Sequence, residues 1–243
     1  PGNMAASHDA HSTLRKTVAD GSSWQEILMF ITGGYWIDQS HWLRGGVARS
    51  EPVLPEAVTQ PYISPRVAIL HTNAGPRKTK WESLISYWRR ADVTGEAHFQ
   101  VHGVNGDAAI VQAIPLNRRA DCNAKANRWS FNGRSYGAIS FETEDRGYPT
   151  LPTTPWSLGQ LDAMIGALTS ICVVYGMSCT EPATWSSSGI GFHSRFQEWS
   201  IYKGKTCPGA ARIAQMAFIR DKVASNLAAF GAATGWRCGQ GAV

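Results

Sequence analysis

The sequence predicts an α/β fold in which helices flank a central mixed β-sheet. Three observations support this prediction. Short apolar runs with strand-like alternation recur along the chain, and stretches with apolar residues at helical spacing lie between them. Two of those stretches also follow the residue pattern of a capping box, which marks the start of a helix. Strands that alternate with helices are typical of a sheet covered by helices.

Length and composition define the expected domain organisation. The chain has 243 residues, of which 43% are apolar, so it can bury a substantial core and is not globally disordered. No apolar run approaches the ~20 residues of a membrane-spanning helix, and no secretory signal segment is evident. We expect residues 1–65 to be an N-terminal extension with a short helix and a Pro/Gly linker, residues 66–230 the main domain, and residues 231–243 a Gly-rich tail or linker.

The N-terminal extension predicts one helix followed by an extended stretch. Ser23 and Glu26 form a capping-box pattern, and Gly33 follows the apolar residues at helical spacing. Residues 45–65 contain a glycine pair and several prolines, which favour an extended linker. Residues 1–22 are polar and mixed, and we expect them to be poorly ordered.

The first half of the main domain predicts a strand, a helix and a hairpin. Val67–His71 is a short apolar run typical of a buried strand, and residues 79–90 carry apolar side chains at helical spacing. Residues 98–102 and 108–114 predict the two strands of a hairpin, joined by a turn at residues 104–107.

The second half adds a loop, a strand and two helices. Residues 117–134 are polar and form a candidate loop over the functional site, and residues 138–144 alternate as a strand. Ser157 opens a long helix with the second capping-box pattern. A Ser/Gly/Pro-rich loop is expected over residues 178–192, and the final helix is expected to start near Pro208.

His71, His193 and Cys207 are the candidate metal ligands. Imidazole and thiolate groups are ligands that zinc prefers, and His71 ends a strand, which is a rigid position. Three protein ligands leave a fourth position open, as in catalytic zinc sites. The alternative is structural: a hydrogen-bonded histidine at a strand end, or a cysteine buried as a small apolar residue. The spacing alone matches no zinc-finger motif.

Four segments around these residues resemble one protein family. Ile69–Thr72, Gly191–His193 and Lys205–Gly209 are similar to the three metal-bearing segments of the zinc-dependent N-acetylmuramoyl-L-alanine amidases. That family includes phage lysins and shares its fold with peptidoglycan recognition proteins. Ile139–Glu144 resembles the strand that carries the catalytic glutamate in its bacterial cytosolic branch. The segments occur in the family's order, within residues 66–230.

The resemblance implies an activity and a role for each residue. It implies that zinc on His71, His193 and Cys207 activates a water, which hydrolyses the amide bond between N-acetylmuramic acid and L-alanine in peptidoglycan. Glu142 would move the proton from the water to the leaving nitrogen. Lys205 would stabilise the oxyanion. Asn73 and His98 are the candidate residues that would line the substrate groove.

Several of these roles have open alternatives. Glu144 lies on the same strand face as Glu142, and some phage relatives use a tyrosine as the acid/base, so three assignments compete for that role. Lys205 can instead be an ordinary surface lysine. His98 and His102 share one strand face, and either can be a core residue rather than a groove contact.

Charge and family resemblance indicate the partner. The formal net charge is +5 and the isoelectric point about 9.1, which favours a polyanion. No Lys/Arg run exceeds two residues and no nucleic-acid motif is evident, so we expect peptidoglycan and not nucleic acid as the partner of a monomeric chain. The resemblance to phage lysins implies synthesis in the cytoplasm of a bacterial host and action on the cell wall after release.

The cysteines bear on both redox state and function. If Cys207 binds metal, four of the five cysteines remain, and Cys172 and Cys179 can bridge a helix end to its following loop. Free thiols are the default for a chain made in a cytosol. The competing function is a peptidoglycan-binding module of the same fold without catalysis. Such relatives typically lose the thiolate ligand, so Cys207 together with Lys205 favours an enzyme.

Overall fold

The structure is a computed structural model that describes residues 23–53, 59–73, 81–90, 93, 95–103, 108–145 and 153–238. Its strands are β1 (Trp36–Ile37), β2 (Leu43–Arg44), β3 (Ala48–Ser50), β4 (Ser64–Leu70), β5 (Phe99–His102), β6 (Ala109–Gln112), β7 (Trp129–Phe131), β8 (Arg134–Thr143) and β9 (Gly189–Phe192). Its α-helices are α2 (Trp24–Ile31), α4 (Trp81–Trp88), α5 (Leu158–Tyr175), α6 (Ala210–Ile213) and α7 (Met216–Thr234), with 3₁₀ turns η1 (Ala124–Asn127), η2 (His193–Arg195) and η3 (Gln197–Trp199).

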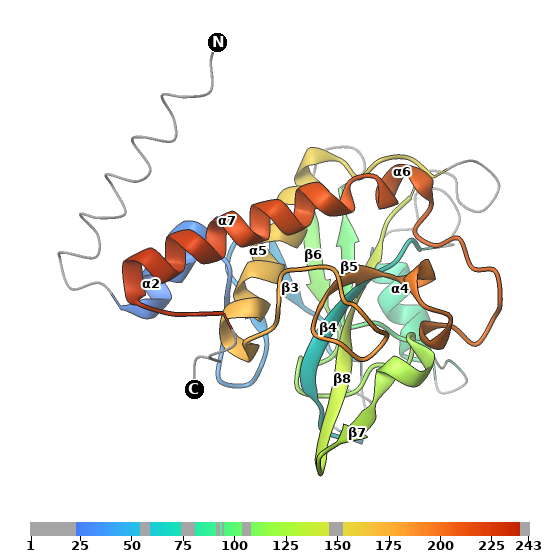
Figure 1. The fold of residues 1–243 in the computed structure, drawn as a ribbon. Coiled ribbons are helices and arrows are strands. Elements are labelled where there is room, and N and C mark those ends of the chain that lie inside the picture. Colours follow the sequence, from blue (N-terminus) through green and yellow to red (C-terminus); the bar gives the residue numbers. More distant parts are fainter. Residues whose placement is uncertain are drawn as a thin grey trace.

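Seven strands form one mixed sheet with helices on both faces (Figure 1), which confirms the predicted fold class. The order is β3-β6-β5-β8-β4-β9, with β7 paired to β8. β4 lies between β8 and β9 and runs parallel to both, and β5 is also parallel to β8. The carboxyl ends of these four strands therefore meet at one edge of the sheet, where the open α/β architecture places ligands.

Strand register places the candidate residues side by side at that edge. Leu70 of β4 pairs with Phe141 of β8 and with Phe192 of β9. The residues that follow in the three strands are His71, Glu142 and His193. Neighbouring strands lie about 4.8 Å apart, so these side chains are adjacent before any loop contributes to the site.

One face of the sheet is covered by α5 and α7, which run side by side, with α2 packed against α7 (Figure 1). The ring of Trp24 meets that of Phe230 edge-on at 5.7 Å between centroids. The sheet contributes alternate apolar side chains to this core: Ala68 and Leu70 from β4, Phe99 and Val101 from β5, Ile139 and Phe141 from β8.

The opposite face carries the polar residues of the edge. Val67 and Ile69 of β4 pack there against Trp199, and α4 packs against the β5–β6 part of the sheet. Because successive side chains of a strand point to opposite faces, His71 and Glu142 project to this second face. The α5–α7 layer therefore does not block access to them.

α5 is a core helix. Ser157 caps it through a reciprocal capping box, as predicted, and Gly176 ends it in the left-handed conformation. Among the described residues it is the one helix that is long and apolar enough to cross a membrane, which corrects the expectation of no such run. However, 72% of that 18-residue window is buried inside the fold, so the apolar composition is explained by packing against the sheet and α7.

The N-terminal region is more structured than the sequence predicts. α2 starts after Ser23 with the predicted capping box. The stretch 45–65, expected as a linker, contains β3, which pairs with β6 and extends the main sheet. The small β1–β2 hairpin was also not predicted. The expectations for residues 1–22 and for the turn at residues 104–107 lie outside the described residues.

Two element boundaries differ from the predictions for the second half of the main domain. β8 starts at Arg134 and pairs with β7, so the loop predicted to end at that residue is shorter. β9 lies inside the predicted loop 178–192. Its glycine-rich sequence does not indicate a strand, and it becomes one because it pairs with β4. The β5–β6 hairpin forms as predicted.

The C-terminal helix is split and longer than predicted. A short α6 follows the Cys-Pro-Gly segment, and α7 continues past Gly231, the expected start of the tail, to Thr234. A Cβ at Gly231 would lie 2.7 Å from the carbonyl oxygen of Trp236, so glycine permits the close return of the chain. Trp236 is buried against the core.

Candidate metal centre

The structure brings together the three residues selected as metal ligands. One ligand atom from each of His71, His193 and Cys207 lies within 4.8 Å of the others, and all three residues are buried. The two imidazole rings are 4.3 Å apart between centroids. His71 follows β4, His193 follows β9, and Cys207 comes from the loop before α6, so the parallel strands and one loop build the cluster.

Each imidazole has one nitrogen fixed by an oxygen acceptor. His71 Nε2 lies 2.7 Å from Asn123 Oδ1, and His193 Nε2 lies 3.0 Å from the Trp199 carbonyl oxygen. These oxygens hold the ring proton on Nε2, so Nδ1 of each ring carries the free lone pair. Hydrogen bonding of the second ring nitrogen to oxygen is the usual support of a metal-binding histidine.

The sulfur of Cys207 is held by the end of β4. Thr72 donates its backbone N–H to Cys207 Sγ at 3.2 Å and its hydroxyl to the Pro208 carbonyl oxygen at 3.0 Å. Gly209 has φ 93°, and a Cβ there would lie 1.9 Å from the Thr153 hydroxyl oxygen. Only glycine fits at this position, which explains the glycine of the Cys-Pro-Gly segment.

The electrostatics of the cluster keep its two imidazoles neutral. Burial lowers the pKa of His71 well below its ordinary value, with His193 and Lys205 adding to the effect. Burial also lowers the pKa of His193 to about 4, again with a contribution from Lys205. Both imidazoles are therefore neutral at neutral pH, which is the form that binds metal.

The thiol completes a donor set that fits zinc. Burial raises the pKa of Cys207 to about 12, and the nearby Glu142 carboxylate adds to the rise. A bound cation would stabilise the thiolate in this buried position. Two neutral imidazoles and one thiolate match the nitrogen and sulfur ligands of zinc and leave one position for a reactant.

Glu142 lies beside this cluster. Its Oε1 is 3.7 Å from His71 Nδ1, and its Oε2 is buried and makes no hydrogen bond within the described part of the chain. Burial raises the pKa of Glu142 to about 8, although the positive charges of Lys205 and Arg212 oppose the rise. A carboxyl group with a pKa this close to neutrality can both accept and donate a proton.

Glu144 has its carboxylate engaged elsewhere. Its Oε2 accepts the backbone N–H of Gly103 at 3.1 Å and lies 3.6 Å from His102 Nδ1. Strand alternation gives Glu144 the same face as Glu142, but β8 ends at Thr143 and the chain then turns. The geometry therefore favours Glu142 as the carboxylate of the site.

A cavity of ≈ 450 Å³ opens onto the cluster. Lys205 and Asn73, both selected from the sequence, line it. Lys205 is exposed, with Nζ 5.1 Å from the centre of the Tyr202 ring. The other lining residues are the three candidate ligands and Glu142, together with Thr72, Leu84, Tyr87, Trp88 and Cys122. Tyr87 thus places a phenol at the site, and a tyrosine is one of the three alternatives for the acid/base role.

The structure does not bring His98 to this cavity. His98 is fully buried, with Nδ1 3.1 Å from the Ser140 hydroxyl and Nε2 2.8 Å from the Arg118 carbonyl oxygen. Burial lowers its pKa to about 4. Both ring nitrogens are hydrogen-bonded inside the fold, so His98 is a core residue and not a groove contact. The five cysteines are all free thiols, including Cys172 and Cys179.

The sequence did not indicate three residues that lie beside the site. Asn123, which fixes His71, lies in the polar segment expected to cover the site, but nothing in that segment distinguishes it. Gln100 pairs in register with Glu142, and its buried amide makes no hydrogen bond in the described structure. Strand alternation would place it on the face of His98. Arg212 is buried next to the cluster although its sequence context is that of an ordinary helix.

Comparisons with known proteins identify the family of the chain. A histidine–histidine–cysteine cluster beside a carboxylate, at the carboxyl edge of a mixed sheet, is the arrangement expected of a metal-assisted hydrolase. Residues 61–210 match the N-acetylmuramoyl-L-alanine amidase family, and the chain belongs to this family. A search of curated protein sequences gave no match.

Two solved structures illustrate the shared fold. An endolysin N-acetylmuramoyl-L-alanine amidase from Clostridium intestinale is 13% identical, covers 76% of this chain and 98% of its own, and has a TM-score of 0.51. The hydrolase AmiA from Staphylococcus aureus, in complex with its ligand, is 12% identical, covers 76% of this chain and 87% of its own, and has a TM-score of 0.52. At these identities the likeness shows the fold.

Proposed function

We propose that this chain is a zinc-dependent amidase that hydrolyses the bond between N-acetylmuramic acid and L-alanine in peptidoglycan. Membership of the amidase family supports the reaction. One observation carries the zinc dependence: donor atoms of His71, His193 and Cys207 within 4.8 Å of one another, next to the carboxyl group of Glu142. The proposed reaction requires a metal-binding cluster and an acid/base carboxyl group in the same site.

His71, His193 and Cys207 would hold the zinc ion. When bound, zinc supplies a Lewis acid and lowers the pKa of water to about 7, so that a nucleophile is available at neutral pH. The protein keeps the donors ready: Asn123 and the Trp199 carbonyl fix the two rings, and the Thr72 amide fixes the sulfur.

Glu142 would act as the general base and then as the general acid. An amide has a poor leaving group, so its nitrogen must receive a proton as the bond breaks. Glu142 lies in the cavity beside His71 and has one carboxyl oxygen unbonded within the described structure, so it can take a proton from the attacking water and deliver it to that nitrogen. A pKa of about 8 permits both transfers near neutral pH.

Lys205 would stabilise the negative oxygen that forms on the attacked carbonyl. Burial is the main cause of the pKa shifts at the site, but the positive charge of Lys205 adds to the lowering of the pKa of His71 and of His193 and opposes the rise of the pKa of Glu142. Its field therefore reaches the reacting region. Asn73 lines the same cavity and would contact the substrate.

The proposed biological setting is a phage endolysin. The similarity in fold to an endolysin amidase and the net charge of +5, which favours an anionic cell wall, support this setting. The chain would act as a monomer, made in the cytoplasm of a bacterial host and acting on the wall after release.

The proposal is tested by separating wall binding from catalysis. Zinc-loaded protein would be incubated with purified peptidoglycan, and sedimentation with the wall and release of new amino termini would be measured together. We expect both, with release abolished in Glu142→Gln and sedimentation retained. Sedimentation without release by the zinc-loaded, unsubstituted chain would instead identify a binding module.

A further inference from the structure

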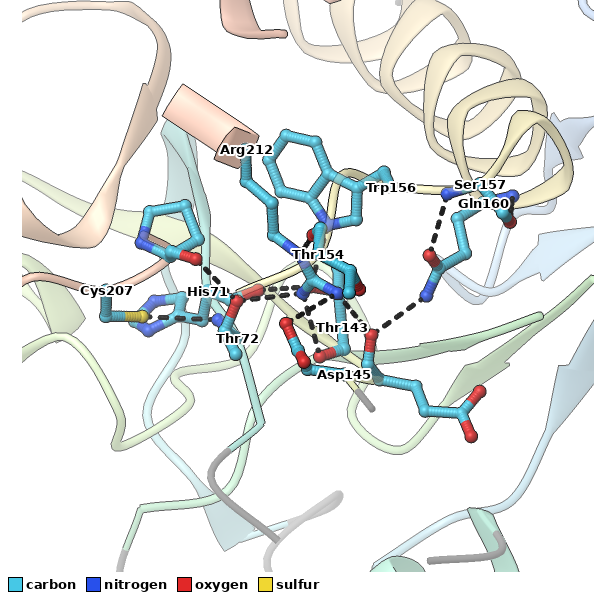
Figure 2. A network of polar contacts seen from close by, with 12 residues as sticks. His71, Thr72, Thr143, Asp145, Thr154, Trp156, Ser157, Gln160, Cys207 and Arg212 are labelled. Atoms are coloured by element: carbon cyan, nitrogen blue, oxygen red, sulfur yellow. Dashed lines mark hydrogen bonds and ion pairs between the residues drawn. The ribbon is translucent and has the colours of Figure 1, made fainter. Parts of the chain in front are cut away.

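Arg212 is a fully buried cation at the back of the candidate site. Its guanidinium group lies between the segment that follows β4 and the end of β8, under the ring of Trp156 (Figure 2). A buried charge is costly unless it is paired and fully hydrogen-bonded. The hydrogen bonds of Arg212 therefore identify the segments that this buried charge holds in place.

One nitrogen of the guanidinium joins the two segments that carry the site. Arg212 Nη1 donates to the hydroxyl of Thr72 at 2.8 Å and to the hydroxyl of Thr143 at 2.7 Å. Thr72 follows His71 directly, and Thr143 follows Glu142 directly. A single donor group thus sets the spacing between a candidate ligand and the candidate acid/base.

The two threonines pass this constraint to the reacting groups. Thr72 donates to Cys207 Sγ and to the Pro208 carbonyl oxygen, so its position fixes the cysteine loop. The Thr143 hydroxyl donates to the carbonyl oxygen of His71. Each threonine hydroxyl donates its proton to the site and accepts from Arg212, and the Thr143 hydroxyl also accepts the indole N–H of Trp156 at 2.9 Å. The network therefore has a defined direction.

The remaining donors anchor the guanidinium itself. Nη2 donates to the Glu144 carbonyl oxygen at 2.6 Å and pairs with Asp145 at 3.1 Å. Nε donates to the Thr154 carbonyl oxygen at 2.9 Å. A planar fork with five donors can make these bonds simultaneously, whereas a lysine ammonium cannot.

We propose that Arg212 is a positioning residue for the amidase reaction, which sets the relative placement of His71, Cys207 and Glu142 through Thr72 and Thr143. This inference rests on the proposed function of the site. It differs from a stabilising role for the buried ion pair, because it predicts that the geometry of the metal ligands depends on the guanidinium fork and not on the charge alone.

The test uses cobalt(II) in place of zinc, because the absorption bands of cobalt report the thiolate ligand and the symmetry of the site. Arg212→Lys keeps the charge and removes the fork. Thr72→Val and Thr143→Val remove one hydroxyl each and retain the buried charge and side-chain volume. Ile219→Ala is the matched control. Ile219 is fully buried in the core beside α7, so its truncation should destabilise the fold without removing any contact of the Arg212 network.

We expect Arg212→Lys to weaken cobalt binding by about 10–100-fold, as for other residues that support metal ligands. We also expect shifted thiolate-to-cobalt bands and a kcat that falls by a similar factor while KM changes little. Each threonine variant should show the same changes in smaller degree and decides the question if Arg212→Lys does not fold. Ile219→Ala should lower the melting temperature and leave cobalt affinity and spectrum unchanged.

Two outcomes contradict the inference in distinguishable ways. If Arg212→Lys and both threonine variants only lose stability, as Ile219→Ala does, and keep cobalt affinity, spectrum and kcat within about twofold, Arg212 is structural and the proposed function stands. If the unsubstituted chain binds no cobalt and releases no product, the proposed function fails and this inference fails with it.

Discussion

The backbone amide of Thr72 donates a hydrogen bond to the sulfur of Cys207 at 3.2 Å, although the two residues are 135 positions apart in the chain. This bond connects the end of β4 to the loop before α6. It places the thiol beside the imidazoles of His71 and His193, which strand register has already made neighbours. The predictions below follow from this assembly.

Cys207→Ser should lose zinc. A hydroxyl replaces the thiolate, which is the soft donor of the set, and two imidazoles alone hold zinc weakly. Elemental analysis after dialysis should show about one zinc per chain in the unsubstituted protein and far less in the variant. Cys122→Ser is the matched control, because Cys122 lines the same cavity but is outside the donor cluster. Equal zinc content in Cys207→Ser and Cys122→Ser would refute the ligand assignment.

Glu142→Gln should keep zinc and lose turnover. The amide retains the shape of the carboxylate but cannot transfer a proton, and general acid/base groups contribute roughly 10²–10⁴-fold to rate. Steady-state hydrolysis of a muramyl peptide measures the effect. Glu144→Gln is the control, since the Glu144 carboxylate is held by the Gly103 backbone. If Glu144→Gln is inactive and Glu142→Gln stays within a few-fold of normal, the acid/base role belongs to Glu144.

Lys205→Met should lower kcat and kcat/KM together. The ammonium is expected to contact an oxygen that is negative only in the transition state, and loss of such a donor costs about 10²–10³-fold. Zinc content and melting temperature should not change, because the side chain is exposed. Wall binding should be retained, because the expected contact forms only in the transition state. Poor wall binding with normal turnover of a soluble muramyl peptide would show that Lys205 docks substrate instead.

His98 should make stability depend on pH below neutrality. Burial lowers its pKa from 6.5 to about 4, so the unfolded chain takes up the proton first as the pH falls. Its contribution is complete above pH 6.5 and is lost between pH 6.5 and pH 4, by up to about 3 kcal/mol at 1.36 kcal/mol per unit. Urea unfolding across this range should give a shallower pH slope for His98→Gln. Identical slopes would show that His98 is not a neutral buried group.

The sequence indicated the candidate ligands because they lie in short local segments. His71, His193 and Cys207 were selected by residue type and context, and the strand before His71 is evident from its apolar run. Glu142 could not be separated from Glu144, since alternation gives both the same face. The end of β8 at Thr143 and the bond from Gly103 to Glu144 distinguish them, and both depend on tertiary structure.

The parts that sequence could not predict depend on contacts between distant segments. β9 is short and glycine-rich, and only its pairing with β4 makes it a strand. β3 lies in a stretch rich in proline and glycine, and its pairing with β6 places it in the sheet. Arg212 stands in an ordinary helical context, so its burial and its bonds to Thr72 and Thr143 could not be anticipated.

The central claim, that this chain hydrolyses the muramyl–alanine amide with a metal at the cluster, is tested most directly by mass spectrometry of the products formed in ¹⁸O-labelled water. The account predicts a muramyl fragment whose lactyl carboxyl carries one ¹⁸O and an unlabelled peptide with a free L-alanine amino terminus. It also predicts that both products disappear after chelation and return with zinc. Label in the peptide or cleavage at another bond would contradict the reaction, and product formation unaffected by chelation would contradict the metal.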